Sequence, residues 1–158
     1  MIRRVFYSFH YKPDCWRVSK VRNIGMIEDN LSVTDNDWET ITRGGDAAIQ
    51  RWIDGQLSGR SCTIVLVGAN TAGRKWINYE IRKSWMDRKG MLGIYIHNLT
   101  DQDGLQCRKG RNPFEELGYS SIVRTYDPPG ADSQSVYRHI AQNLSAWVED
   151  AIRIRQSY

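Results

Sequence analysis

The sequence predicts an α/β fold in which a central parallel sheet of about five strands lies between two layers of helices. Short apolar runs rich in β-branched residues alternate with stretches whose apolar residues recur at helical spacing. These runs lack the alternation of apolar and polar residues that is typical of a strand with one face in solvent. They therefore indicate strands covered on both faces. At 158 residues, the chain is expected to form a single domain, residues 1–158, with a sizeable core.

The N-terminal segment predicts a strand followed by a helix. Arg3 to Phe9 reads RRVFYSF, and its valine and aromatic residues favour a strand. Pro13 and Asp14 then indicate a turn into a helix that runs to about Val21 or Asn23, with Asp14 as the N-cap.

The stretch from Ile24 to Thr42 is the least regular part of the sequence. A short strand near Met26-Ile27 or Leu31-Val33 fits its apolar pairs. We expect the rest to form a loop of the kind that covers active sites. Gly44-Gly45-Asp46 then opens a helix that has an apolar face and ends at Gly59.

The central segment of the chain predicts a buried strand that leads into an amphipathic helix. Cys62 to Val67 is a continuous apolar run, ended by Gly68 and a polar loop. The helix follows, with Ile77, Ile81 and Trp85 on one stripe, and it is expected to stop at Gly90.

The C-terminal half predicts two more strands and a long helix. Met91 to His97 and Ser121 to Tyr126 are the strands, separated by a loop from Asn98 to Glu116. From about Ser135 an apolar stripe marks the helix: Val136, Ile140, Leu144, Trp147, Val148, Ala151 and Ile152. With at most five strands, the expected arrangement is a three-layer fold with a flavodoxin-like sheet in the middle.

Composition argues against several classes of protein. The net charge of +4 permits weak attraction to phosphates, but the basic residues are scattered, so we expect no specific nucleic-acid partner. The one basic cluster, Arg108 to Arg111, is interpreted as a solvated loop. Three cysteines without a CxxC pair indicate the cytoplasm. No run approaches the length of a membrane span, so no membrane association is expected.

Common catalytic and cofactor motifs are missing from the sequence. The loop from Gly68 to Gly73 lies where a phosphate-binding loop would, but Arg74-Lys75-Trp76 replaces the required Lys and Ser/Thr. There is no G-x-G-x-x-G for a dinucleotide cofactor and no G-x-S-x-G nucleophile elbow. The three histidines lack zinc-ligand spacing, and Asp35-Asn36-Asp37 lacks the glycine and glutamate of a calcium loop. We therefore expect neither a metal nor a cofactor.

The carboxylate of Glu80 is predicted to lie near the carboxyl end of a central strand, where ligands bind in α/β folds. Glu80 lies one turn after Trp76 on the helix that leaves the carboxyl end of the Cys62–Val67 strand. Ser8, Phe9 and His10 end another strand and are expected to face Trp76 and Glu80 across a cleft. Spacing alone leaves a structural role for Glu80 open, since a glutamate suits the start of any helix. His10 is equally open as a ligand contact or a solvated residue.

Two segments resemble Toll/interleukin-1 receptor (TIR) domains. Val5 to Phe9 with Asp14 resembles the first TIR motif, and Ser61 to Glu80 resembles the segment with a strand, a loop, a Trp and, four residues later, a Glu. The closer resemblance is to the TIR-like ThsB family of the bacterial Thoeris antiphage system. It rests on the order and spacing of SFHY, VRN, TIVLVG, TAGRKWINYEI, GIYIH and NPF, up to about Phe114.

This resemblance implies a TIR-like fold and cleavage of NAD+, which would be the substrate rather than a cofactor. Glu80 matches the glutamate essential for breaking the nicotinamide–ribose bond, while Ser8, Phe9, His10 and Trp76 would bind the substrate. The remaining nucleotide would become a cyclic ADP-ribose isomer that activates an effector protein after phage infection. Self-association is a further expectation. This fits the residues, because an adjacent carboxylate stabilises an oxocarbenium-like ribosyl centre.

Two other functions stay open at the level of sequence. Many TIR adaptors share the fold without activity, so the chain could be a non-catalytic interaction domain that docks a partner through its loops. A similar fold also serves other N-glycosidic enzymes that use a glutamate, such as nucleoside deoxyribosyltransferases and nucleotide hydrolases. Activity on NAD+, on nucleosides or on neither separates the three.

Overall fold

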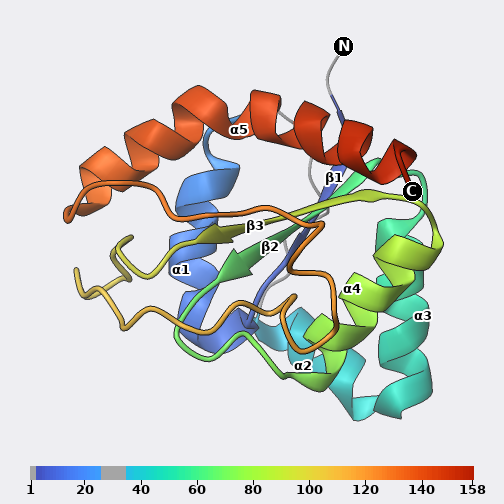
Figure 1. Ribbon diagram of the computed structural model, residues 1–158. Coiled ribbons are helices and arrows are strands. Elements are labelled where there is room, and N and C mark those ends of the chain that lie inside the picture. Colours follow the sequence, from blue (N-terminus) through green and yellow to red (C-terminus); the bar gives the residue numbers. More distant parts are fainter. Residues whose placement is uncertain (1–2, 26–34) are drawn as a thin grey trace.

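The computed structural model describes residues 3–25 and 35–158, with the side chains of residues 35–38 excepted (Figure 1). The strand expected near Met26-Ile27 or Leu31-Val33 lies outside the described residues. The described sheet has four parallel strands, one fewer than expected, in the order β1-β2-β3-β4. These strands are β1 (Val5–Ser8), β2 (Cys62–Val67), β3 (Gly90–Tyr95) and β4 (Thr125–Tyr126).

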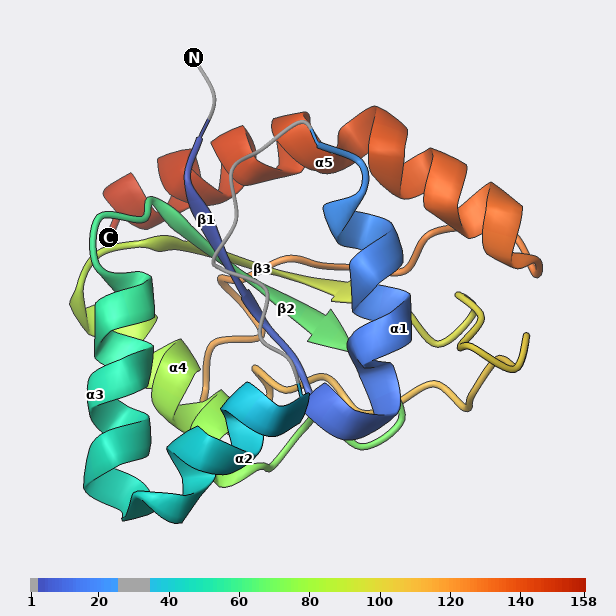
Figure 2. The same cartoon turned by 180° about the vertical axis from the view of Figure 1, so that it is seen from behind.

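Helices cover both faces of this sheet, as the apolar character of the strands requires (Figures 1 and 2). One face packs against α1 (Tyr11–Arg22) and α5 (Ser133–Gln156). The other packs against α3 (Gly45–Leu57) and α4 (Lys75–Met86). The three-layer α/β fold predicted from the sequence is therefore confirmed.

The pleat of β1 decides which of its side chains reach α4. Val5 and Tyr7 point into the core under α1 and α5, whereas Phe6 joins the cluster under α3. Because side chains alternate along a strand, Ser8 lies on the same face as Phe6. Ser8 pairs with Val65 of β2, so the two strands reach their carboxyl ends together.

The chain leaves these two neighbouring strands in opposite directions. β1 continues into α1 on one face, and β2 continues into α4 on the other. In open α/β sheets such a divergence opens a crevice at the carboxyl ends of the strands. The described part of the fold thus has the crevice of a flavodoxin-like protein between β1 and β2.

Several predicted boundaries were wrong. The helix after the first strand begins at Tyr11, with His10 as its N-cap, so Asp14 is a buried helical residue and no cap. The last strand is only Thr125–Tyr126. The amides of Ile122 and Val123 both donate to the carbonyl of Tyr119, and this local turn replaces strand pairing.

Two further differences concern the helices. Part of the irregular stretch forms α2 (Asp35–Arg43), whose Ile41 packs against the Phe6 cluster. α4 ends at Met86, before the expected stop at Gly90. Gly90 instead begins β3 beside α5, where a Cβ atom would lie 2.7 Å from the backbone nitrogen of Ile152. A glycine is needed there because the helix backbone comes so close.

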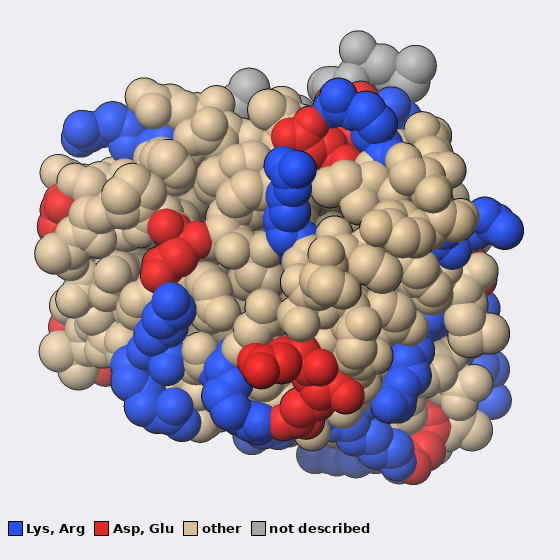
Figure 3. All heavy atoms as spheres, viewed as in Figure 1, with Lys and Arg blue, Asp and Glu red and all other residues tan. Residues whose placement is uncertain are grey.

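The C-terminal helix and the Cys62 strand are buried, as their apolar patterns predicted. The stripe from Val136 to Ala151 is buried against the sheet, and Cys62 is a fully buried free thiol. Across the described residues, none of the helices combines the length and apolarity needed to cross a membrane. On the face shown in Figure 3, basic side chains are dispersed among acidic and uncharged ones.

Candidate active site

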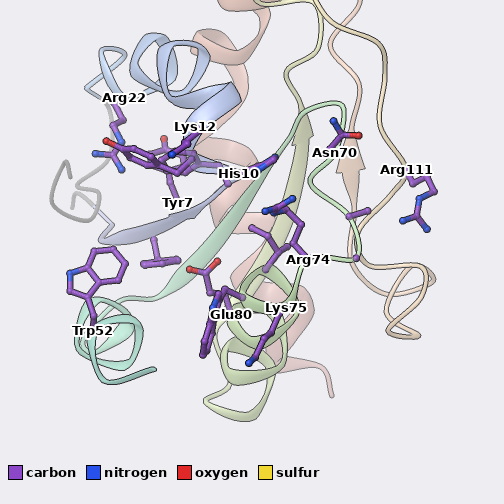
Figure 4. A pocket seen from close by; sticks show the side chains of 17 residues that line it. Tyr7, His10, Lys12, Arg22, Trp52, Asn70, Arg74, Lys75, Glu80 and Arg111 are labelled. Carbon is purple, nitrogen blue, oxygen red and sulfur yellow. The ribbon is translucent and has the colours of Figure 1, made fainter. Parts of the chain in front are cut away.

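A cavity of about 670 Å³ opens at the carboxyl ends of β1 and β2. Its walls come from the end of β1, the start of α1, α3, and the loop that joins β2 to α4 (Figure 4). The aromatic residues that line it are Phe6, Tyr7, Phe9, Tyr11, Trp52 and Trp76. The cavity has the size and the mixed apolar and polar lining of a small-molecule site.

Glu80 is the only acidic side chain among the described residues that line this cavity. It lies one turn into α4 on the face turned toward the sheet, and only 7% of it is exposed. Its carboxyl points from α4 toward the middle of the cavity, between Trp52 on one side and Arg74 on the other (Figure 4). The Ser8 hydroxyl donates a 2.6 Å hydrogen bond to Glu80 Oε1.

Burial raises the pKa of the Glu80 carboxyl to about 8, and the Ser8 hydrogen bond lowers it only in part. A carboxylate removed from water loses its hydration, so burial favours the neutral form of the carboxyl. A cation bound beside Glu80 would favour the charged form again. The carboxyl is therefore suited to a ligand that carries positive charge close to it.

Within the described part of the chain, five basic side chains from three segments line the same cavity. Lys12 and Arg22 come from α1, Arg74 and Lys75 from the start of α4, and Arg111 from the loop after β3. Lys75 pairs with Asp46, and Arg111 pairs with Glu116. This excess of positive charge suits a ligand with phosphate groups.

His10 lies between β1 and α1 on the cavity wall. Its Nδ1 is buried and accepts or donates no hydrogen bond among the described residues. Burial, together with the positive charge of Arg74, lowers the pKa of its imidazole below the usual 6.5. The lowered pKa favours the neutral imidazole, so the positive charge of the site comes from its lysine and arginine side chains.

A buried ion pair supports the loops around the cavity. Arg17 Nη1 donates to Asp14 Oδ1 over 3.0 Å, and both side chains are almost fully buried. The same guanidinium donates to the carbonyls of Leu99 and Leu105 in the loop after β3. The Asp14 carboxyl also lies against Gly68, where a Cβ atom would come within 2.1 Å of Oδ2. Asp14 thus joins α1 to the loop that leads into α4.

Four of the five site residues predicted from the sequence line this cavity: Phe9, His10, Trp76 and Glu80. Ser8 is fully buried behind the Glu80 carboxyl and is not among the described residues that line it. The geometry thus brings the two predicted segments together, while the catalytic and binding roles stay predictions.

Sequence reasoning missed most of the basic and aromatic lining, including Lys12, Arg22, Trp52 and Arg74. Only Arg74-Lys75 gave a signal, because the pair directly precedes Trp76. The Arg108–Arg111 cluster, interpreted as a solvated loop, contributes Arg111 to the cavity. Arg108 binds Asn70 of the β2–α4 loop. Within residues 3–25 and 35–158, no group of His, Cys, Asp or Glu could hold a metal ion.

Comparisons with known proteins point to one family. The family model "Thoeris protein ThsB, TIR-like domain" matches residues 6–101. The chain is also 40% identical over 124 residues to a Bacillus cereus (strain MSX-D12) protein named "Putative cyclic ADP-D-ribose synthase ThsB1". That match covers 75% of this chain and 65% of the relative, so the chain spans about two thirds of that protein's length. The chain belongs to the family of Thoeris ThsB proteins with a TIR-like domain.

Proposed function

We propose that this chain cleaves NAD+ at the nicotinamide–ribose bond and closes the remainder into a cyclic ADP-ribose isomer. The observation that carries the proposal is the buried Glu80 carboxyl in a cavity whose described lining includes five basic and six aromatic side chains. The name of the Bacillus cereus relative supports the same chemistry. In a Thoeris system the product would activate an effector protein in the cytoplasm after phage infection.

The charges of the cavity fit those of NAD+. The pyrophosphate carries two negative charges, which basic side chains of the lining such as Arg74, Lys12 and Arg22 would neutralise. The nicotinamide ring is a cation, which aromatic faces and a carboxylate both attract. A nucleoside has no phosphate to use these basic residues, so the cavity favours a nucleotide substrate.

Glu80 would act on the sugar rather than on the leaving group. Nicotinamide departs as a neutral base with the bonding electrons, so no proton has to be donated to it. Positive charge then develops on the ribose carbon, and the carboxylate stabilises it at short range in a site of low dielectric. One carboxylate is sufficient for this step, in contrast to the two that glycosidases use.

Cyclisation requires that a nucleophile of the same molecule reaches the ribosyl centre before water does. The aromatic lining supports this, since Trp52, Trp76 and Phe9 present apolar surface around the Glu80 carboxyl. Trp52 comes from α3, and the helix is anchored by the buried side chains of Ile49 and Ile53. An aromatic wall on an anchored helix can hold the nucleotide in a folded shape.

A substrate panel tests this function. The full chain is incubated with NAD+, nicotinamide riboside and deoxynucleosides, both purified and in lysates of phage-infected cells that express it. Mass spectrometry and nicotinamide release then report each reaction. We expect a cyclic ADP-ribose isomer from NAD+ and no reaction of deoxynucleosides.

Two results would overturn the proposal. Turnover of deoxynucleosides without NAD+ cleavage would indicate a different N-glycosidic enzyme. Absence of all turnover in both settings, combined with phage protection that survives Glu80→Gln, would indicate an interaction domain. The surface variant Glu115→Gln serves as the matched control, because Glu115 is exposed and outside the cavity.

A further inference from the structure

The contact behind Glu80 indicates a role for Ser8 that differs from substrate binding. Ser8 is 0% exposed and ends β1, while the cavity lies on the far side of the Glu80 carboxyl. The only hydrogen bond described for the carboxyl is the 2.6 Å contact from the Ser8 hydroxyl to Oε1. The second oxygen, Oε2, is left for the cavity.

We propose that Ser8 is a positioning residue, which holds the Glu80 carboxyl toward the cavity and stabilises the ionised form that acts on the substrate. This inference rests on the proposed cleavage of NAD+. A hydroxyl that donates to a carboxylate favours the charged form, and the effect is strong where water is excluded. Ser8 thus acts through Glu80 and has no contact with the substrate.

The fold explains why a serine is needed at this place. The same face of β1 carries Phe6, which packs in an apolar cluster with α3. An apolar residue at position 8 would match the apolar character of that cluster, but it would leave a buried carboxyl without its described donor. Burying such a group without a partner is costly and would favour its neutral form.

Other titratable groups around the carboxyl come from every neighbouring element, and Ser8→Ala leaves all of them in place. They are His10, Tyr11, Lys12 and Arg22 from the β1–α1 segment, Arg74 and Lys75 from the start of α4, Arg111 from the loop after β3, and the Asp54–Tyr79 pair between α3 and α4. In the described portion of the chain, none of them pairs with Glu80. A change in Glu80 titration in the variant would therefore report the lost hydroxyl.

The test is a titration of Glu80 in the full chain. The six glutamates are labelled with ¹³C at the side-chain carboxyl, and the Glu80 signal is the one that Glu80→Gln removes. We expect Ser8→Ala to move this titration to higher pH. For each unit of movement, the ionised fraction at pH 7 falls about tenfold. The rate of NAD+ cleavage should fall with it at pH 7 and recover at high pH.

A matched control separates this role from a purely structural one. Ser84 is also fully buried on α4, where its hydroxyl hydrogen bonds with Thr63 and donates to the backbone carbonyl of Glu80. Ser84→Ala therefore removes an equivalent hydroxyl that makes no hydrogen bond to the Glu80 carboxyl. It should lower stability without moving the titration of Glu80. If Ser8→Ala does not fold, Ser8→Cys replaces it with a weaker donor of similar size, and a smaller shift in the same direction is expected.

Two outcomes would overturn the inference. An unchanged Glu80 titration in Ser8→Ala would show that the hydroxyl does not stabilise the charged form. A loss of rate that is equal at all pH values would show that Ser8 only maintains the fold. Failure of the proposed function gives a different result, because then the wild-type chain would not cleave NAD+ while the titration could still move.

Discussion

Replacing Glu80 by glutamine should make the protein more stable at neutral pH and leave its stability unchanged in acid. The pKa of Glu80 is raised from 4.5 to about 8, chiefly by burial. Between these values the folded state binds more protons than the unfolded state, so the free energy of unfolding falls as pH rises. The stability that the protonated Glu80 contributes is fully present below pH 4.5 and is lost as pH rises through 8.

The size of the effect follows from the shift. Each pKa unit corresponds to about 1.4 kcal/mol, so a shift of roughly 3.5 units sets an upper limit of about 5 kcal/mol. Between pH 5 and pH 7 the free energy of unfolding of the wild-type chain should fall by roughly 2.5 kcal/mol relative to that of Glu80→Gln. For a chain of this length that equals a difference in Tm on the order of 5–10 °C.

The assay is urea or thermal unfolding of both proteins at several pH values from 5 to 8.5. Taking the difference between the two removes the titration of every other group, including His10 and His97. Glu115→Gln, on the surface, should follow the wild type throughout. A difference between wild type and Glu80→Gln that stays constant across this range would refute the reasoning, because it would mean that the carboxyl is not perturbed by burial.

Three further predictions concern the cavity and its supporting loops. Arg74→Ala should raise KM for NAD+ at least severalfold while changing cleavage of nicotinamide riboside little, because only NAD+ carries the pyrophosphate; equal losses on both substrates would contradict this role. Trp52→Ala should shift the product from cyclic to linear ADP-ribose, as water enters beside Glu80, and an unchanged product ratio measured by mass spectrometry would exclude it. Gly68→Ala should destabilise the fold by about 1–3 kcal/mol, because the new Cβ would clash with Asp14. Gly55→Ala, in open space on α3, should instead stabilise it by roughly 0.5–1 kcal/mol. Denaturant unfolding measures both changes, and the opposite ranking of the two variants would contradict the close packing of Gly68 against Asp14.

The sequence allowed the elements with continuous apolar patterns to be predicted well. Cys62–Val67 and the stripe of α5 were found at nearly their observed positions, because each pattern is long and buried on the expected face. Boundaries that depend on local hydrogen bonds were missed. The short β4 is an example, since the carbonyl of Tyr119 captures the amides of Ile122 and Val123.

The site was predictable where it lies on the central elements. Glu80 and Trp76 are fixed by the spacing of α4, and Phe9 and His10 by the end of β1. The missed residues depend on tertiary structure. Trp52 reaches the cavity because α3 packs beside Phe6, and Arg111 does so because a loop distant in sequence folds back. No local pattern in the sequence contains this information.

Ser8 shows how the structure changes the interpretation of a residue predicted from the sequence to bind substrate. Its position at the end of β1 indicated contact with a ligand. The pleat of the strand instead places it on the α4 face, behind the Glu80 carboxyl. The register of β1 against β2, which brings Ser8 level with Val65, fixes this placement and could not be read from the sequence alone.

The most direct test of the account is the reaction of NAD+ with the wild-type chain and with Glu80→Gln, side by side. Nicotinamide release is followed over time, and mass spectrometry identifies the nucleotide product. We expect the wild type to release nicotinamide and form a cyclic ADP-ribose isomer, and we expect a folded Glu80→Gln to lose at least a hundredfold in rate, because the amide cannot supply the negative charge. Full turnover by folded Glu80→Gln would contradict the account.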